Sequence, residues 1–374
     1  MKIHDTVKKK VMVTGGHVTP AIATIDALMK NHPEWQIVFV GRKTALEGDR
    51  TLSEEYRLIN AKHIRFLSII AGRLKREGGV RAFITLMKVP VGFVQAVWDV
   101  LTERPDVIVS FGGYVGLPVV AAGWILRVPI VTHEQTRRPG LANRIISRFA
   151  TRTCVSFPGD TVGLHGNLIY TGLPLRESVL HPQLTSSITL PKKKRPLLLV
   201  VGGSTGARSM NTIIYEALPA LLRTFTVLHQ VGRISVNKSI EVRSSLIENR
   251  DHYIPIPYLS EDEYAWVLHR AKLVIGRSGA NTVMEIAVVG KVALFVPLPW
   301  SAGNEQYFNA LFLKEAGSAE ILPQKDLSLN ALVQTVTRMM DEYADRDRRA
   351  ALLAVQVPHD GSLKLVRVIE ELVH

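Results

Sequence analysis

The stretch Lys272–Pro297 combines a small-residue turn with a carboxylate, a pairing that suits phosphate and hydroxyl binding. The pattern predicts a short strand, a tight turn, and a helix over Ala280–Val289 with Ser278 as its cap and Gly290 as its stop. A helix N-terminus behind such a turn presents free N–H groups and a positive dipole end to an anion. Glu285 lies in the first turns of this helix, where its carboxylate can accept two ribose hydroxyls. The unit therefore indicates a nucleotide pocket, although an ordinary crossover with Glu285 on a solvated face has the same pattern.

Three small-residue turns follow predicted strands: Thr14–His17, Gly202–Arg208 and Arg277–Gly279. Ligands of parallel sheets bind outside the carboxyl ends of the strands, where these turns lie. None of them has the G-x-G-x-x-G pattern or the Lys-Ser/Thr of a P-loop, which argues against a dehydrogenase or an ATPase. A single turn of this kind is often structural, but three of them favour an enzyme that handles phosphates in a cleft.

Two positions offer proton-transfer chemistry. His17 follows two glycines and precedes a helix, so the positive helix end disfavours imidazolium and leaves a neutral ring that can accept a proton. The alternative is a histidine that only caps the helix. His133 and Glu134 end a predicted strand, where active-site groups are common, and the alternative there is a polar loop. No spacing resembles a zinc site or a Ser/His/Asp set, so no metal or cofactor is expected.

Strands that alternate with helices must position these groups. This alternation predicts two doubly wound α/β domains with parallel sheets and a cleft between them, joined by a linker rich in proline and lysine near residues 172–195. The predicted strands are Lys10–Val13, Trp35–Val40, His63–Ile69, Asp106–Ser110, Pro129–Thr132, Leu197–Val201, Thr226–Gln230 and Val292–Val296. The predicted helices include Pro20–Met29, one from about Leu117, Leu141–Phe149, one capped by Ser260 and Glu263, Leu327–Tyr343 and Leu363–Val373.

Composition limits the partners. The chain has 374 residues, 47% of them hydrophobic, and a formal net charge of +13, which favours an anionic partner. Its one cysteine, Cys154, excludes an internal disulfide and is expected to be inert in the core. No secretory signal and no apolar run of about 18 residues is apparent. The segment Ile69–Lys88 mixes cations with apolar residues and suits an anionic membrane surface, or else forms a solvated helix face. Nucleic acid is not expected, because the glycine turns lack interleaved aromatic and basic residues.

Taken together, the segments resemble the MurG family of N-acetylglucosaminyltransferases, which convert lipid I to lipid II in peptidoglycan synthesis. The matching segments are TGGHVTPA, FGGYVGLP, HEQTRRPGLAN, TGLPLR, GGSTGAR, GRSGANTVMEIA and NEQYFNA, in family order from Thr14 to Ala310. The resemblance implies a glycosyltransferase-B fold. It also implies inverting transfer from UDP-N-acetylglucosamine (UDP-GlcNAc) to the 4-hydroxyl of the muramoyl sugar in lipid I. A peripheral protein on the cytoplasmic face of the bacterial cell membrane is expected.

The resemblance also assigns residues. It makes His17 the candidate general base. Glu134 is placed in the loop that faces the acceptor and is the second candidate for the base. Glu285 is expected to hold the ribose hydroxyls, and Arg176 and helix N-termini to stabilise the departing diphosphate without a metal. The complete set that the resemblance places at the donor is Thr14, Gly15, Gly16, Thr136, Arg176, Gly203, Ser204, Leu259, Ala280, Glu285, Glu305 and Gln306. The first turn of the family is also expected to hold the acceptor diphosphate.

The resemblance divides the chain into an acceptor and membrane domain (1–172), a UDP-sugar domain (173–350) and a C-terminal helix (351–374) that packs on the first domain. Five residues differ from the family pattern: Met12 and Val13 replace a glycine pair, Thr136 an asparagine, and Thr205 and Glu305 a glutamine each. These differences bear on acceptor binding and sugar contacts. Two alternatives fit the same residues: a glycosyltransferase of this fold that acts on diacylglycerol, and an inactive protein that binds UDP-sugar or membrane.

Overall fold

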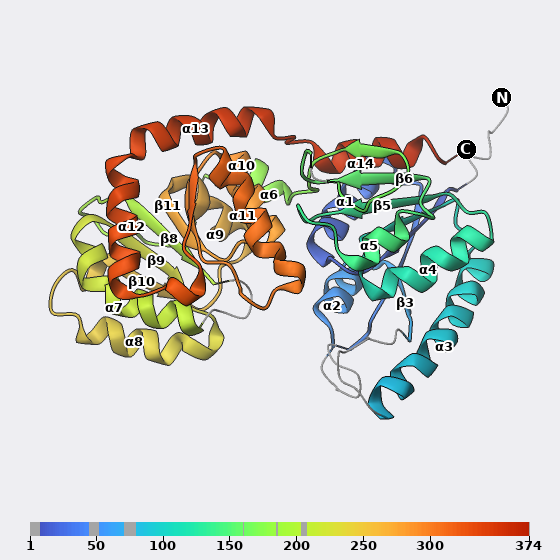
Figure 1. Ribbon diagram of the computed structural model, residues 1–374, viewed down its shortest axis with the longest axis horizontal. Helices are drawn as coiled ribbons and strands as arrows, with labels where there is room; N and C mark the ends of the chain where they lie inside the picture. Colours follow the sequence, from blue (N-terminus) through green and yellow to red (C-terminus); the bar gives the residue numbers. More distant parts are fainter. Residues whose placement is uncertain are drawn as a thin grey trace. The chain divides into compact units, whose positions relative to one another are not determined.

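The computed structural model describes residues 8–44, 52–70, 80–159, 161–184, 186–202 and 208–373, without the side chains of 80–89. The chain divides into two compact units, one formed by Met1–Leu175 with Asp360–His374 and the other by Arg176–His359. Each unit is built on a parallel sheet whose strands alternate with helices along the chain (Figure 1). The predicted pair of doubly wound parallel α/β folds is confirmed.

The first unit has a sheet in the order β3-β2-β1-β4-β5-β6-β7. Its strands are β1 (Lys10–Thr14), β2 (Gln36–Gly41), β3 (Arg65–Ser68), β4 (Val107–Ser110), β5 (Ile130–Glu134), β6 (Arg152–Val155) and β7 (Leu168–Tyr170). Its helices are α1 (Val18–Asn31), α2 (Glu54–Ala61), α3 (Val80–Glu103), α4 (Gly113–Ile125), α5 (Leu141–Ile146) and α14 (Gly361–Glu370). β1 pairs with both β2 and β4, so the strand order reverses direction beside it.

Strand residues of the first unit alternate between two apolar layers, as the period of two requires. Val11 and Val13 of β1 pack with α1 and α14, whereas Met12 between them packs with residues of α3 and α4. Both faces of the sheet are therefore covered, which explains why its central strands carry apolar residues at consecutive positions. The C-terminal helix α14 completes the first of these layers, with Leu365 fully buried.

The second unit has a sheet in the order β10-β9-β8-β11-β12-β13. Its strands are β8 (Leu197–Val201), β9 (Thr226–Gln230), β10 (Tyr253–Ile256), β11 (Ala271–Gly276), β12 (Val292–Phe295) and β13 (Ala319–Ile321). Its α-helices are α6 (Glu177–Leu180), α7 (Arg208–Thr224), α8 (Val236–Ser245), α9 (Glu261–Arg270), α10 (Ala280–Val289), α11 (Glu305–Glu315), α12 (Leu329–Asp341) and α13 (Tyr343–Gln356). Short 3-10 turns are η1 (Arg233–Ser235), η2 (Arg250–His252), η3 (Ala302–Asn304) and η4 (Gln324–Asp326).

The core of the second unit contains a chain of buried polar groups. Tyr253 donates its hydroxyl proton to His229 Nδ1 at 3.2 Å, and His229 Nε2–H donates to Asn211 Oδ1 at 3.1 Å. Asn211 Nδ2–H then donates to the carbonyl of Val231 at 2.9 Å, which fixes the order of donors and acceptors. Burial lowers the pKa of His229 to about 3, so the imidazole is neutral in the folded chain.

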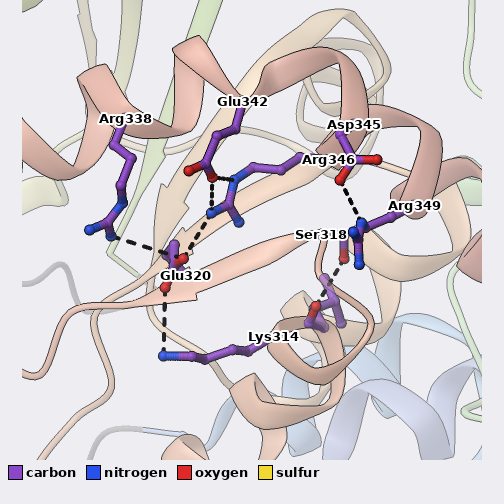
Figure 2. A network of polar contacts seen from close by, with 9 residues as sticks. Lys314, Ser318, Glu320, Arg338, Glu342, Asp345, Arg346 and Arg349 are labelled. Carbon is purple, nitrogen blue, oxygen red and sulfur yellow. Dashed lines mark hydrogen bonds and ion pairs between the residues drawn. The ribbon is translucent and has the colours of Figure 1, made fainter.

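A cluster of ion pairs fastens the corner between α12 and α13 (Figure 2). Glu320 on β13 accepts a hydrogen bond from Arg346 Nη2 at 2.8 Å and has Lys314 Nζ at 3.5 Å and Arg338 Nη2 at 3.9 Å. Arg346 also donates to Glu342, the residue between the two helices, at 2.6 Å. These cations lower the pKa of Glu320 against the opposing effect of its own burial. The cluster therefore connects three helices of this unit to one edge strand.

Most predicted strands and helices are confirmed to within a few residues, including the capping box of Ser260 and Glu263 and the left-handed stop at Gly290. The predicted cap Ser278 is wrong: Gly279 is the N-cap of α10, and the Ser278 side chain is fully buried instead. Helix α4 begins at Gly113 and not near Leu117, and Pro118 lies inside it, where proline has no N–H to donate to the carbonyl four residues earlier.

Two further helices differ from the prediction. The whole of α13 was missed, because the prediction ended a helix at its first residue and began the next after it. The predicted membrane segment Ile69–Lys88 lies mostly outside the described side chains, and α3 continues past it through Pro90 to Glu103. Cys154 is buried in the core, as expected, and burial raises its pKa to about 12, which disfavours the reactive thiolate. In the described ranges, no helix has the length and apolarity that crossing a membrane requires.

Candidate active site

In the first unit, two glycine turns meet where β1 and β4 end. A Cβ on Gly16 would lie 2.3 Å from the carbonyl oxygen of Gly112, so only glycine allows this approach. The same contact brings His17 to the start of α1 beside the turn that opens α4. The Thr14 side chain is fully buried and donates to Ser110 Oγ at 3.2 Å, so it positions the turn and is closed to a ligand. Gly15 packs against the buried carboxylate of Glu55.

His17 occupies the N-cap position of α1, yet its side chain makes no capping hydrogen bond. The ring is partly buried, and desolvation lowers its pKa to about 4. A neutral imidazole at pH 7 can accept a proton, which is the property expected from the sequence. Nearby, His133 is fully buried, and its pKa is also lowered to about 4, by burial first and by the charge of His17 last. The Nε2–H of His133 donates to the carbonyl of Gly172 at 3.2 Å.

Glu134 organises the loop that follows β5. Its Oε1 accepts from the Thr136 N–H at 2.8 Å and lies 2.7 Å from the Thr136 hydroxyl. Its Oε2 accepts from the Gly140 N–H at 3.1 Å and from Asn143 Nδ2 at 2.9 Å. Burial raises the pKa of Glu134, and these hydrogen bonds lower it. Both oxygens are thus engaged by donors, an arrangement that fits a carboxylate that shapes a loop better than one that removes a proton.

In the second unit, the predicted donor residues gather where β11 ends. Glu285 is 1% exposed, and its Oε1 accepts from both Nε (3.0 Å) and Nη2 (2.5 Å) of Arg176. Burial raises the pKa of Glu285, and the Arg176 charge lowers it. Ala280 is the first residue of α10, so its N–H lies at the positive end of that helix. Gly203 and Ser204, in the predicted diphosphate turn, lie outside the described residues.

The remaining predicted donor residues flank this edge. Leu259 is buried, and its N–H donates to Gln230 Oε1 at 3.3 Å, at the end of β9. Gln306, in the first turn of α11, accepts from the Leu298 N–H at 2.9 Å through its Oε1. Glu305 precedes it as the first residue of the same helix. The structure therefore groups these residues near the carboxyl ends of strands in one sheet.

Arg277 is a residue of this edge to which sequence reasoning gave no role. Its guanidinium donates to the Val296 carbonyl at 2.8 Å and to Gln324 Oε1 at 2.7 Å. No carboxylate pairs with it in the described part of the chain, and burial lowers its pKa. Its Nε, Ser278 Oγ and Asn281 Oδ1 are buried without a hydrogen-bond partner among the described residues. Unpaired buried polar atoms are costly, so the donors Arg277 Nε and Ser278 Oγ beside a helix N-terminus favour an anionic ligand, whereas Asn281 Oδ1 can only accept a hydrogen bond. The signal in the sequence was an arginine directly after a buried strand.

Asn143 is the second residue that sequence reasoning left without a role. It joins the loop of Glu134 to the strand β5 through its side-chain amide, and it packs against Gly112. The only signal for it was an asparagine in the segment after His133–Glu134, because a helix of six residues is too short to show a clear period.

Two family models match the chain. The glycosyltransferase family 28 N-terminal domain matches residues 12–155, and the glycosyltransferase family 28 C-terminal domain matches residues 197–357. Each match falls within one of the two units. The paired parallel sheets, with turns and polar residues at their carboxyl ends, and these matches define the chain as a family 28 glycosyltransferase.

A relative from Treponema denticola is 36% identical over 327 residues, which are 84% of this chain and 83% of the relative. A relative from Clostridium kluyveri is 29% identical and covers 97% of this chain and 99% of its own. Both are named UDP-N-acetylglucosamine–N-acetylmuramyl-(pentapeptide) pyrophosphoryl-undecaprenol N-acetylglucosamine transferase. The crystal structure of Acinetobacter baumannii MurG matches with a TM-score of 0.77 at 25% identity, over 97% of this chain and 99% of that one. The chain belongs to the MurG family, which confirms the resemblance and the glycosyltransferase-B fold.

Proposed function

We propose that this chain transfers N-acetylglucosamine from UDP-GlcNAc to the 4-hydroxyl of the muramoyl sugar in lipid I, which makes lipid II for peptidoglycan synthesis. The observation that carries the proposal is 36% identity over 84% of the chain with a relative named for this transfer. The geometry supplies the groups that the reaction needs. The first unit offers the neutral imidazole of His17, and the second unit offers the buried carboxylate of Glu285 and the unpaired polar atoms around Arg277.

In the proposed mechanism, His17 takes the proton of the acceptor hydroxyl as the oxygen attacks the anomeric carbon from the face opposite UDP. A pKa of about 4 makes a weak base, but the anionic diphosphate of the acceptor beside the turn would raise the pKa of His17 toward neutrality. Glu134 holds the loop that receives the acceptor. The bond between the sugar and UDP breaks with its electron pair on the diphosphate, which stays bound.

The departing diphosphate gains negative charge. The N-terminus of α10 and the guanidinium of Arg277 are positive groups that are fixed at the same edge of the sheet. Groups that are already oriented stabilise developing charge without a reorganisation cost. Arg176, at the start of α6, adds a third positive group close to Glu285.

We also propose that the first unit meets the anionic cytoplasmic face of the membrane, where a lipid-linked acceptor lies. Along α3, apolar side chains recur at helical spacing and are each half exposed or more: Val91, Val94, Trp98 and Leu101. Trp124, near the end of the neighbouring helix α4, is 56% exposed. Tryptophan favours the membrane interface, and the net charge of +13 adds attraction to anionic lipid.

The choice of acceptor tests the proposal. The purified chain is supplied with UDP-GlcNAc and equal amounts of a lipid I analogue and diacylglycerol in one detergent solution. Glycosylated lipid I analogue, with diacylglycerol left unchanged, is the expected result. Transfer to diacylglycerol alone would replace the proposal by the alternative acceptor, and UDP binding without any transfer would indicate the inactive binding protein.

A further inference from the structure

One guanidinium holds one oxygen of the carboxylate that the proposed function assigns to the ribose. Arg176 Nε–H and Nη2–H both donate to Glu285 Oε1, at 3.0 and 2.5 Å. Arg176 is the N-cap residue of α6, and Glu285 lies 109 residues later on α10 of the same unit. Because Glu285 is 1% exposed, a hydroxyl pair has no access to this oxygen while the guanidinium occupies it.

The arginine is more exposed to solvent than the carboxylate. Its side chain is 22% exposed, against 2% for that of Glu285. The guanidinium carbon lies 5.1 Å from the centre of the Tyr264 ring, and Nη1 lies 3.9 Å from the exposed Glu261. Tyr264 therefore supports the guanidinium on one face, while the exposed part leaves it a route out of the ion pair.

The cost of separating this pair depends on what replaces it. Removing one partner of a buried ion pair is strongly unfavourable, because the other charge remains buried and unpaired. A ligand that offers only two hydroxyls provides the buried Glu285 carboxylate with neutral donors. It leaves the Arg176 guanidinium without a negatively charged partner. A ligand that also carries phosphates provides the guanidinium with a new charged partner, to which it can make two parallel hydrogen bonds. The exchange therefore favours ligands that combine a diol with a phosphate chain.

We propose that Arg176 is a specificity-determining residue: by holding Glu285 it makes the donor site exclude free nucleosides and admit nucleoside diphosphates, since binding exchanges one ion pair for another. This inference rests on the proposed function, which places the ribose at Glu285. The competing view is a permanent ion pair that only braces α6 against α10.

Calorimetry with uridine and with UDP separates these views. In Arg176→Met the stem is kept and the charge is lost. We expect uridine to bind about 5-fold more tightly than to the parent and UDP about 10-fold more weakly, so that the two affinities move in opposite directions. Arg176→Lys keeps a charge but loses the two-donor geometry, and we expect smaller changes of the same signs. Arg243→Met, at an exposed position on α8, is the matched control and is expected to change neither affinity.

The outcomes are distinct. One contrary result is that uridine and UDP both lose affinity in the Met and the Lys variants alike, and another is that neither affinity changes in either variant. Either result would show that the proposed exchange of ion pairs is wrong and that the Arg176–Glu285 pair only holds α6 against α10. The Lys variant answers the question if the Met variant does not fold. Glu285→Gln separately tests the site: if the parent binds UDP and this variant binds it equally well, the ribose lies elsewhere, and the proposed site and the exchange both fail. If UDP binding requires Glu285 but the affinities for uridine and UDP move in parallel in the arginine variants, the proposed function stands and the exchange alone fails.

Discussion

The carboxylate of Glu134 accepts a hydrogen bond of 2.9 Å from the side-chain amide of Asn143, which ties the end of β5 to helix α5. The same oxygen accepts from the Gly140 N–H, and the other oxygen accepts from Thr136. The loop between β5 and α5 therefore closes on one buried side chain. This relationship favours His17 over Glu134 as the general base, because both oxygens of the buried Glu134 carboxylate are occupied by donors within its own loop.

Glu134→Gln replaces one acceptor oxygen by an NH2 group that faces a donor. We expect the loop to loosen and kcat/KM for the lipid acceptor to fall about 10-fold or more, with UDP affinity unchanged. The acid limb of the pH–rate profile should stay where the parent has it. Asn143→Leu, which removes one of the four donors, should give a smaller loss in the same direction. If the acid limb disappears in Glu134→Gln, Glu134 is the base and the assignment to His17 is wrong.

His17→Ala removes the proposed base. Turnover should fall about 100-fold or more while calorimetry shows near-normal UDP affinity. The pKa of His17 is lowered to about 4, so in the free enzyme the ring is neutral above that pH and protonated below it. The acid limb of kcat/KM is therefore expected near pH 4 rather than near 6.5. Turnover within a few-fold of the parent would show that His17 is structural.

The strands and turns of the site could be predicted because they depend on local sequence. The stop at Gly290 needs a left-handed residue, and the capping box needs Ser260 and Glu263 three residues apart, so both follow from neighbouring positions. Arg176 and Glu285 pair across a sequence separation of 109 residues, and no local pattern indicates this contact. The prediction of Ser278 as the N-cap of α10 failed for a related reason. The turn buries Ser278, and Gly279 takes the N-cap position, which depends on how β11 packs.

His229 makes stability depend on pH. Its pKa is lowered to about 3 in the folded chain, against about 6.5 when unfolded, so between these values the unfolded chain binds one more proton. Its contribution is therefore complete above pH 6.5 and is lost as the pH falls, by about 1.4 kcal/mol for each pH unit down to about 3. Urea unfolding of the parent and of His229→Gln at pH 6, 5 and 4 measures this difference in slope. Equal slopes for the two chains would contradict a neutral, buried His229.

The apolar face of α3 should bind membranes in a salt-insensitive manner. Val94→Ser with Trp98→Ser is expected to lower sedimentation with anionic vesicles at both low and high salt, because apolar burial is not screened. Replacing Arg73, Lys75 and Arg76 by Ser should lower binding mainly at low salt, where each cation near the surface contributes about 1 kcal/mol.

The control for the membrane prediction is Trp300→Ser, which removes an equally exposed tryptophan from the second unit. It should sediment with vesicles as the parent does, and activity on a short-chain soluble acceptor should survive in the α3 variant. If the α3 variant and the variant with Arg73, Lys75 and Arg76 replaced by Ser both sediment like the parent, the docking surface lies elsewhere on the chain.

The linkage in the product tests the central claim most directly. UDP-GlcNAc carries the sugar with the α configuration, so attack from the face opposite UDP must give a β bond to the 4-hydroxyl of the muramoyl sugar. Nuclear magnetic resonance of the disaccharide made from UDP-GlcNAc and a lipid I analogue reads both the anomeric configuration and the position. The account predicts a β bond at the 4-position with one UDP released per bond. An α bond, a bond at another hydroxyl, or released UDP with only free N-acetylglucosamine would contradict it.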